Sequence, residues 1–240
     1  MCTVTYIPTV DKYNFVLTSN RDEKSVRPTL LPEIAEYHGI KLCFPMDVES
    51  GGSWIAMNNR GRIVCLLNGG FVAHLKKEFH THSRGKVLFD LAVSELHASS
   101  FFESQHLENT EPFTILTIDQ KDGIVLSFSE MIWDGTHKHY RELDTETPQI
   151  WSSVTLYDDK ERKLRTEWFR QFLETHNTEI TKNDIFNFHS KAHTHNQEID
   201  LVMQRNNGIK TVSITQITSN GKLEMTYNDL QNKKTSFNQL

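Results

Sequence analysis

Strand pairs joined by short polar turns stand near both ends of this chain, and they limit the folds that it can adopt. Residues 3–8 and 13–19 form one such pair, and residues 210–218 and 222–227 form another around Ser219-Asn220-Gly221. Asn, Gly and Pro favour these turns because they adopt the backbone angles of a tight reversal. Hairpins make neighbouring strands antiparallel, and helices between them must cover a sheet face. The pattern therefore predicts an α+β layered fold.

The spacing of apolar residues predicts the other elements. Strands are expected at residues 3–8, 13–19, 41–45, 53–58, 62–68, 113–119, 123–129, 131–134, 138–142, 149–153, 210–218 and 222–227. Helices are expected from the N-cap Ser83 to about Leu96, over 158–175 and over 182–190. With 37% hydrophobic residues the chain can form a core, so we expect a single domain over 1–240 with a polar, loosely held tail at 229–240.

Composition argues against several classes of function. The formal net charge of −5 argues against nucleic acid as a partner. No run of 18 apolar residues is present, so we expect no integral membrane segment, and we also expect no secretory signal. The glycines form neither a phosphate loop nor a dinucleotide fingerprint, so we expect no cofactor.

The cysteines indicate a reducing environment. The chain has three, Cys2, Cys43 and Cys65, which provide no disulfide framework. Cys43 and Cys65 lie in apolar, strand-like runs, so we expect them to be inert thiols in the core. This use of cysteine is typical of a reducing compartment, and we expect a cytoplasmic protein.

Cys2 is the first candidate for a catalytic residue. It follows the initiator methionine, which is normally removed when the next residue is small, so that the mature chain begins with a cysteine. Such a residue supplies a nucleophile and its own general base, since the ordinary pKa is about 8.5 for the thiol and about 7.7–8.0 for the α-amino group. The alternative is a cysteine without function at a frayed terminus.

A polar cluster, Asn20-Arg21-Asp22-Glu23, ends the second predicted strand. The first hairpin would bring this cluster back beside Cys2. An arginine near a cysteine lowers the pKa of the thiol and can hold a substrate carboxylate or carbonyl, while an aspartate can fix the ammonium or orient the arginine. We therefore predict Arg21 and Asp22 as catalytic and Asn20 as substrate-binding. The alternative is an ordinary polar loop after a strand.

Several segments together resemble the NRDE family, which includes the eukaryotic transport and Golgi organisation 2 proteins and lies within the N-terminal nucleophile (Ntn) hydrolase superfamily. The matching segments are Cys2, Ser19-Asn20-Arg21-Asp22-Glu23, Arg27-Pro28-Thr29, Gly51-Gly52-Ser53-Trp54-Ile55-Ala56, Asn59-Arg60-Gly61-Arg62, Leu67-Asn68 and Ser83-Arg84-Gly85. They cover residues 2–90 in the family's order, and the match is looser from residue 110 onwards.

This resemblance implies a four-layer αββα sandwich with two antiparallel sheets between helices. Relatives with known chemistry, such as penicillin V acylase and bile salt hydrolase, cleave an amide bond with an N-terminal cysteine. The resemblance also implies that Asn68, in Leu67-Asn68-Gly69-Gly70, helps to bind the oxyanion, with Gly69 and Gly70 allowing a close backbone approach. Without the resemblance, Asn68-Gly69 reads as a simple turn.

Two positions depart from the family pattern. The family commonly has Leu-Ser-Asn where this chain has Trp151-Ser152-Ser153, so the shorter Ser153 would replace a carboxamide. The family often has Gly-Thr-Arg where this chain has Ile209-Lys210-Thr211, so Lys210 keeps the charge without the bidentate fork. We predict Ser153 and Lys210 as substrate-binding residues in these altered forms.

The histidines include two His-x-His pairs, His80-Thr81-His82 and His193-Thr194-His195. Such pairs can bind zinc, yet no cysteine pair or carboxylate stands at ligand spacing beside them. We therefore predict solvated loop histidines and no metal site.

Two functions remain open. The first is a cysteine amidohydrolase that cleaves a linear, non-peptide C–N amide bond of a small or acylated substrate, with Cys2, Arg21, Asp22 and Asn68 as its catalytic residues. The second is a non-catalytic protein that handles or traffics lipid or haem and retains the Ntn hydrolase fold. The presence of Cys2, Arg21 and Asp22 together favours the enzyme, and the Ser153 departure favours the binding protein.

Overall fold

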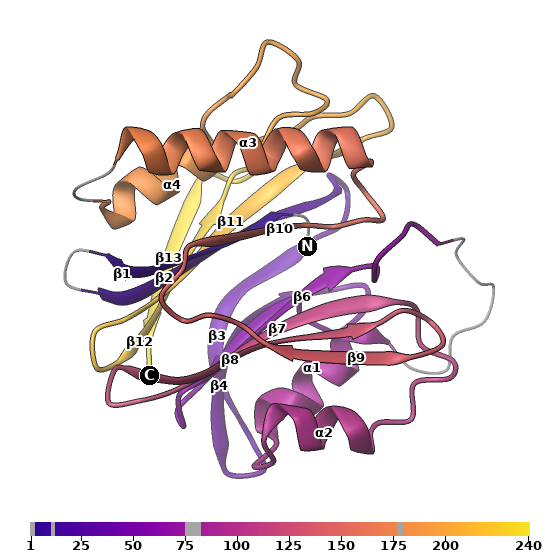
Figure 1. The fold of residues 1–240 in the computed structure, drawn as a ribbon, viewed down its shortest axis with the longest axis vertical. Coiled ribbons are helices and arrows are strands. Elements are labelled where there is room, and N and C mark those ends of the chain that lie inside the picture. The colour runs from indigo at the N-terminus through magenta and orange to yellow at the C-terminus, as the bar shows by residue number, and fades with distance from the viewer. Residues whose placement is uncertain (1–2, 11–12, 75–82, 177–179) are drawn as a thin grey trace.

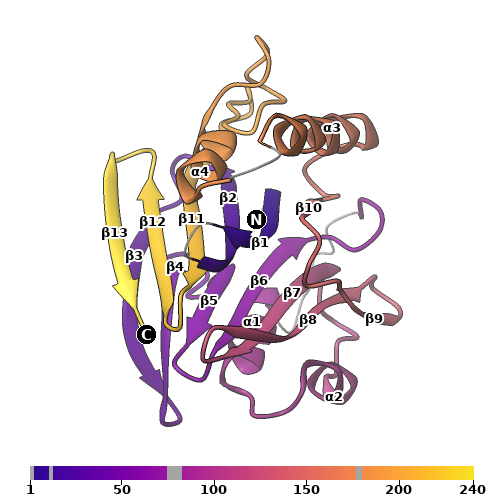
Figure 2. The same ribbon diagram turned by 60° about the vertical axis from the view of Figure 1, so that its left-hand side comes forward.

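The fold was analysed in a computed structural model that describes residues 3–10, 13–74, 83–176 and 180–240. In these residues, two antiparallel sheets face each other, and helices cover the outer side of each sheet (Figure 1 and Figure 2). This α+β sandwich of four layers confirms the predicted fold class.

The first sheet contains the N-terminal hairpin and the C-terminal strands. Its strands, in spatial order, are β10 (Gln149–Ser152), β1 (Thr3–Val10), β2 (Tyr13–Lys24), β11 (Ile209–Ser219), β12 (Leu223–Asp229) and β13 (Lys234–Gln239). The second sheet has its strands in sequence order. They are β3 (Thr29–Tyr37), β4 (Ile40–Asp47), β5 (Ile55–Asn58), β6 (Arg62–Asn68), β7 (Phe113–Lys121), β8 (Ile124–Trp133) and β9 (Lys138–Glu142).

The helices form the two outer layers. Helices α1 (Arg84–Val93) and α2 (Ala98–Ser104) pack on the second sheet, and α3 (Asp159–Thr175) and α4 (Lys182–Ser190) pack on the first sheet (Figure 1). The α3 helix begins with a capping box, in which the Asp158 carboxylate accepts from the Glu161 backbone N–H and the Glu161 carboxylate accepts from the Asp158 backbone N–H. The predicted helix start is therefore correct, and it fixes where the chain leaves β10.

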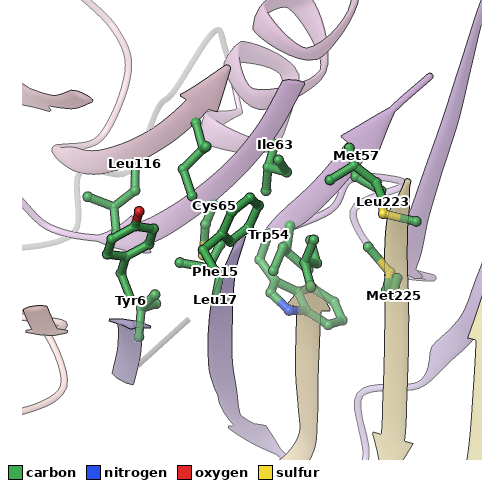
Figure 3. Close-up of a cluster of buried hydrophobic side chains, with 14 of the residues drawn as sticks. Tyr6, Phe15, Leu17, Trp54, Met57, Ile63, Cys65, Leu116, Leu223 and Met225 are labelled. Atoms are coloured by element: carbon green, nitrogen blue, oxygen red, sulfur yellow. The ribbon is translucent and has the colours of Figure 1, made fainter. Parts of the chain in front are cut away.

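Successive side chains of a strand point to opposite faces of its sheet, so one strand packs against two layers. Along β1, Val4 and Tyr6 enter the core between the sheets, whereas Ile7 packs in the outer layer with α3 and α4. Figure 3 shows Tyr6 and Leu17 of the first sheet beside Cys65 of the second. Because both faces of β1 and β2 are covered, their side chains are buried in unbroken runs.

Three elements were not predicted, and several predictions had other bounds. The strand expected at 13–19 is β2, which runs to Lys24 and so contains the polar cluster Asn20-Arg21-Asp22-Glu23. The unpredicted elements are β3, α2 and β13, and the strands expected at 123–129 and 131–134 are one strand, β8. The helix expected to reach Leu96 ends at Val93. Strand β3 contains Pro32 at a register irregularity, and proline in an apolar run argues against a strand.

The expectation of a loosely held tail at 229–240 is wrong. Asp229 ends β12, and Lys234–Gln239 form β13, which pairs with β12 in antiparallel register from Asp229↔Lys234 to Glu224↔Gln239. Backbone hydrogen bonds hold this edge strand, and its mostly polar side chains give no hydrophobic period to detect. Among the described residues, no helix is both long and apolar enough to cross a membrane.

Candidate active site

The start of β1 is the reference point for the site. Thr3, the residue after Cys2, pairs with Asn20 of β2 on one side and with Ser152 of β10 on the other. Cys2 itself lies outside the described residues. Arg21 is the next residue after Asn20, and Ser153 is the next residue after Ser152. These two predicted site residues therefore lie on either side of the start of β1.

Arg21 is buried and held rigidly. Its guanidinium group forms an ion pair with Asp47 of β4, donates to the Thr29 hydroxyl at 2.6 Å, and lies 4.3 Å from the ring centre of Trp54. Burial raises the pKa of Asp47, but the Ser50 backbone N–H together with Arg27 and Arg21 outweighs burial and holds that pKa below its ordinary value. Arg21 is therefore a fixed cation facing the second sheet.

Asp22 points to the other side of β2 and does not orient Arg21, which corrects one of the two predicted roles. Its carboxylate accepts hydrogen bonds from the Tyr157 hydroxyl and, at 2.5 Å, from the Thr211 hydroxyl. Successive residues of a strand face opposite sides of the sheet, so the side chains of Arg21 and Asp22 cannot meet. The other predicted role, fixing an ammonium group, stays a prediction.

Asn20 is hydrogen-bonded to the outer layer, and its predicted contact with substrate stays a prediction. It is fully buried, and its amide nitrogen donates to the carbonyl oxygens of His189 at 3.1 Å and Leu201 at 2.8 Å. Its side-chain oxygen lies 2.6 Å from Nδ1 of His189, which must carry the proton there because an amide oxygen only accepts. These contacts join β2 to the outer layer.

Asn68 combines a fixed backbone with an uncommitted side chain. It ends β6, and its carbonyl oxygen accepts from the Ser153 hydroxyl at 2.8 Å and from the Thr155 hydroxyl at 3.4 Å. The next residue, Gly69, has φ +91°, and a Cβ atom there would lie 2.5 Å from Val154. Among the described residues, none hydrogen-bonds to the Asn68 carboxamide, so it can donate to a bound group.

Ser153 lines a cavity together with Asn68 and Trp151, and its predicted contact with substrate stays a prediction. It is 2% exposed, and its hydroxyl hydrogen is directed to the Asn68 carbonyl oxygen. Lys210 is also separate from the other candidates. It pairs in register with Glu23 and lines a different cavity, with Ser190 and Gln231 among the other lining residues.

Two cavities meet at Asn68. The Trp151 cavity has a volume of about 420 Å³, and the Trp54 cavity has a volume of about 290 Å³. The Trp151 cavity is lined by Leu67, Asn68, Gly69, Gly70, Phe71, Thr114, Glu130, Ile132, His139, Tyr140, Arg141, Ile150, Trp151, Ser152, Ser153, Val154, Arg162 and Thr166. The Trp54 cavity is lined by Arg21, Glu23, Arg27, Asp47, Ser50, Gly52, Ser53, Trp54, Leu66, Asn68, Ser83, Arg84, Gly85 and Glu111.

The two cavities differ in chemistry. The walls of the Trp151 cavity combine apolar side chains, such as Phe71, Ile132 and Trp151, with polar ones. Its buried Glu130 carboxylate accepts from Trp151 at 2.9 Å and from Arg141 at 2.5 Å. The Trp54 cavity is lined by paired charges, such as Arg84 with Glu111 at 3.0 Å. A molecule with an apolar part and a polar part can therefore span Asn68.

The close approach of two backbones brings separate sequence motifs together at the Trp54 cavity. A Cβ atom on Gly85, in the first turn of α1, would lie 3.4 Å from the Cα atom of Gly52. The segments Gly51-Gly52-Ser53-Trp54 and Ser83-Arg84-Gly85 thus form neighbouring walls of one cavity.

The other two cysteines lie in the core, as predicted. Cys43 and Cys65 are both fully buried, and burial raises the pKa of each thiol to about 12. Of the His-x-His pairs, His80 and His82 lie outside the described residues, and His193 stacks on Trp168 with 5.1 Å between ring centres. The described residues contain no group of three or more ligands suited to a metal ion.

Sequence reasoning missed several residues around the site. His189 carries a detectable signal, because it lies four positions after Ile185, which is also buried, on the same face of its helix. Asp47 and Tyr157 carry none, since their partners Arg21 and Asp22 are 26 and 135 residues away along the chain.

The fold and this arrangement define the chain as an Ntn hydrolase-type αββα sandwich, and known structures share that fold. An N-acylethanolamine-hydrolyzing acid amidase ortholog from Caenorhabditis elegans superposes with a TM-score of 0.63 at 12% identity, covering 91% of this chain and 93% of that chain. The C2A mutant of a conjugated bile acid hydrolase from Clostridium perfringens gives 0.59 at 10% identity, covering 100% and 92%. Penicillin V acylase from Agrobacterium tumefaciens gives 0.56 at 10% identity, covering 98% and 85%.

The sequence identifies the family of this chain. Residues 1–227 match the profile of the Transport and Golgi organisation 2 family, and the chain belongs to that family. No curated protein matches the chain in sequence.

Proposed function

We propose that this protein is an N-terminal cysteine amidohydrolase that cleaves a linear, non-peptide C–N amide bond of a small or acylated substrate. One observation carries the proposal. The start of β1 lies between Asn20 of β2 and Ser152 of β10. The residue after Asn20 is the buried cation Arg21, and the residue after Ser152 is Ser153, which donates to Asn68. A nucleophile at Cys2 would stand beside both. The fold shared with three amide-cleaving proteins supports this chemistry.

The proposed reaction begins after Met1 is removed. The α-amino group of Cys2 takes the thiol proton, and the thiolate attacks the amide carbonyl carbon. The Asn68 carboxamide donates to the oxyanion that forms, and the α-ammonium returns its proton to the departing amine as the C–N bond breaks. Water then hydrolyses the thioester and restores the thiol.

The neighbouring charges have separate tasks in this proposal. Asp22, whose carboxylate is fixed by Tyr157 and Thr211, holds the α-ammonium group. Arg21, fixed by Asp47, stabilises the thiolate by its charge. Lys210, in its separate cavity, contacts no reacting group and at most attracts substrate. The absence of a disulfide framework among the three cysteines supports a reducing, cytoplasmic setting in this proposal.

A second candidate function is a non-catalytic protein that binds lipid or haem. It is favoured by one observation: the Ser153 hydroxyl is committed to Asn68 and cannot also donate to an oxyanion.

A hydrolysis screen separates the two functions. Wild-type protein and Cys2→Ala should be incubated with a panel of N-acyl amino acids and related amides, and the released amine should be measured. We expect the wild type to hydrolyse at least one class and Cys2→Ala to hydrolyse none. The matched control Cys43→Ala removes a core thiol and should keep turnover. Binding of panel members without hydrolysis by either protein would favour the second function.

A further inference from the structure

We propose that the hydroxyls of Ser153 and Thr155 form a clamp that positions Asn68 relative to the nucleophile, so that both are positioning residues. The proposal deepens the proposed function and rests on it for its catalytic part. Ser153 follows β10 in the first sheet, whereas Asn68 ends β6 in the second sheet. The clamp therefore bridges the two sheets at the site.

The contacts of the clamp converge on one atom. The carbonyl oxygen of Asn68 accepts from the Ser153 hydroxyl at 2.8 Å. The Thr155 hydroxyl oxygen lies 3.4 Å from the same carbonyl oxygen and 3.0 Å from the Ser153 hydroxyl oxygen, so it can donate its one hydrogen to either. A carbonyl oxygen has two lone pairs, so it can accept both bonds. The clamp thus acts on the backbone of Asn68 and leaves its carboxamide free.

Packing adds to these hydrogen bonds. Gly69 lies directly against Val154 and Thr155, where only the absence of a side chain allows the approach. Gly69 also donates its N–H to the Pro112 carbonyl at 3.0 Å, and its own carbonyl accepts from Thr114 at 3.0 Å. The end of β6 is therefore held from both sides.

The clamp is also connected to β1 and β2, the strands next to the proposed nucleophile. The Tyr157 backbone N–H donates to the Ser153 carbonyl at 3.1 Å, which closes a turn, and the Tyr157 hydroxyl donates to Asp22 of β2. Ser152 pairs with Thr3. A continuous set of contacts thus runs from β1 and β2 through the turn to Asn68, and it sets the spacing between elements on opposite sheets.

This arrangement gives a role to the serine at position 153, where the family commonly has asparagine. A carboxamide at this position could donate to an oxyanion directly, whereas the shorter serine reaches the Asn68 backbone. Oxyanion donors act because they are held in place before the charge develops, so a group that fixes Asn68 contributes to turnover without contact to substrate.

The first test needs no activity. In protein labelled with ¹⁵N-asparagine, the side-chain NH₂ signals of Asn68 are assigned by their absence in Asn68→Ala. We expect one sharp pair in the wild type and in Ser153→Thr, which keeps the hydroxyl, and broadened or shifted signals in Ser153→Ala and Thr155→Val. Thr235→Ala, which removes a hydroxyl on β13, serves as the control. An unchanged Asn68 pair in folded Ser153→Ala would overturn the clamp.

The second test uses turnover. Loss of one positioning hydrogen bond should lower kcat about tenfold in Ser153→Ala, with KM little changed. In an Asn68→Ala background the same substitution should cost little more, because the clamp acts only through Asn68. Independent, multiplying losses would contradict the clamp. Altered NMR signals without any amide hydrolysis would keep the clamp and reject the proposed enzyme.

Discussion

At the scale of single residues, Asn68 separates two tasks between its backbone and its side chain. Its carbonyl oxygen is bound by Ser153 and Thr155, so the backbone cannot shift to follow a ligand. Its carboxamide lines both cavities and has no partner among the described residues. These are the properties expected of a preorganised donor to charge that develops in the transition state.

Replacing Asn68 tests this role. We expect Asn68→Ala to reduce kcat about 10²–10³-fold with little change in KM, because the lost donor matters mainly in the transition state. Steady-state kinetics on a substrate from the amide panel gives both constants. Labelling of Cys2 by a thiol reagent should persist in this variant. A parallel loss of ligand affinity would make Asn68 a ground-state contact instead.

His189 gives the stability of the protein a pH dependence. It is fully buried between Thr5 and Asn20, and burial, with help from His193 and Arg165, lowers its pKa to about 3. An unfolded histidine binds a proton below about 6.5, so the unfolded state gains protons first as pH falls. Stability is therefore complete above about pH 6.5 and is lost toward pH 3, by up to about 1.4 kcal/mol per pH unit.

Urea unfolding at several pH values measures this effect. The pH dependence between 6.5 and 4 should be smaller in His189→Gln than in the wild type, because only the wild type carries this buried imidazole. His195→Gln, on an exposed loop residue, is the control and should follow the wild type. Identical curves for all three proteins would show that His189 titrates normally.

At the scale of elements, the contact between the end of β6 and the segment after β10 brings the site together. Gly69→Ala should be costly for two reasons: φ is +91°, and the new Cβ would clash with Val154 and Thr155. Gly221→Ala shares the positive φ, at +96°, but meets open space. Strain alone costs about 1–3 kcal/mol, so unfolding free energies should fall further for Gly69→Ala than for Gly221→Ala. Equal losses would mean that the contact is loose.

The elements show what the sequence could predict. Both terminal hairpins, the α+β class and the start of α3 follow from turn residues, apolar spacing and capping. The four-layer αββα arrangement was implied by the resemblance to the NRDE family. Strand β13 does not, since its polar residues are held by pairing with β12 and give no pattern. The site residues, too, could be predicted only in part. Arg21 and Asn68 stand beside motifs that mark them, but the side of the strand on which Asn20 and Asp22 face depends on register with distant strands.

At the scale of the whole molecule, the ion pair of Arg21 and Asp47 joins the two sheets inside the Trp54 cavity. The side chains are 4% and 6% exposed. Removing one partner leaves a buried charge unpaired, so Asp47→Ala should cost about 3–5 kcal/mol of unfolding free energy. The exposed pair of Arg162 and Asp159 offers the control, and Asp159→Ala should cost at most about 1 kcal/mol. A small effect of Asp47→Ala in chemical denaturation would show that water reaches Arg21.

In the proposed reaction, Cys2 forms a covalent acyl intermediate after Met1 is removed. The most direct measurement is to mix the protein with an amide that it hydrolyses, quench in acid within one turnover, and determine the mass of the intact chain and its peptides. We predict a chain that lacks Met1 and carries the acyl group on Cys2, with Cys43 and Cys65 unmodified because both thiols are buried and have a pKa raised to about 12. Full activity with Met1 retained, or an acyl group on any residue other than Cys2, would contradict the account.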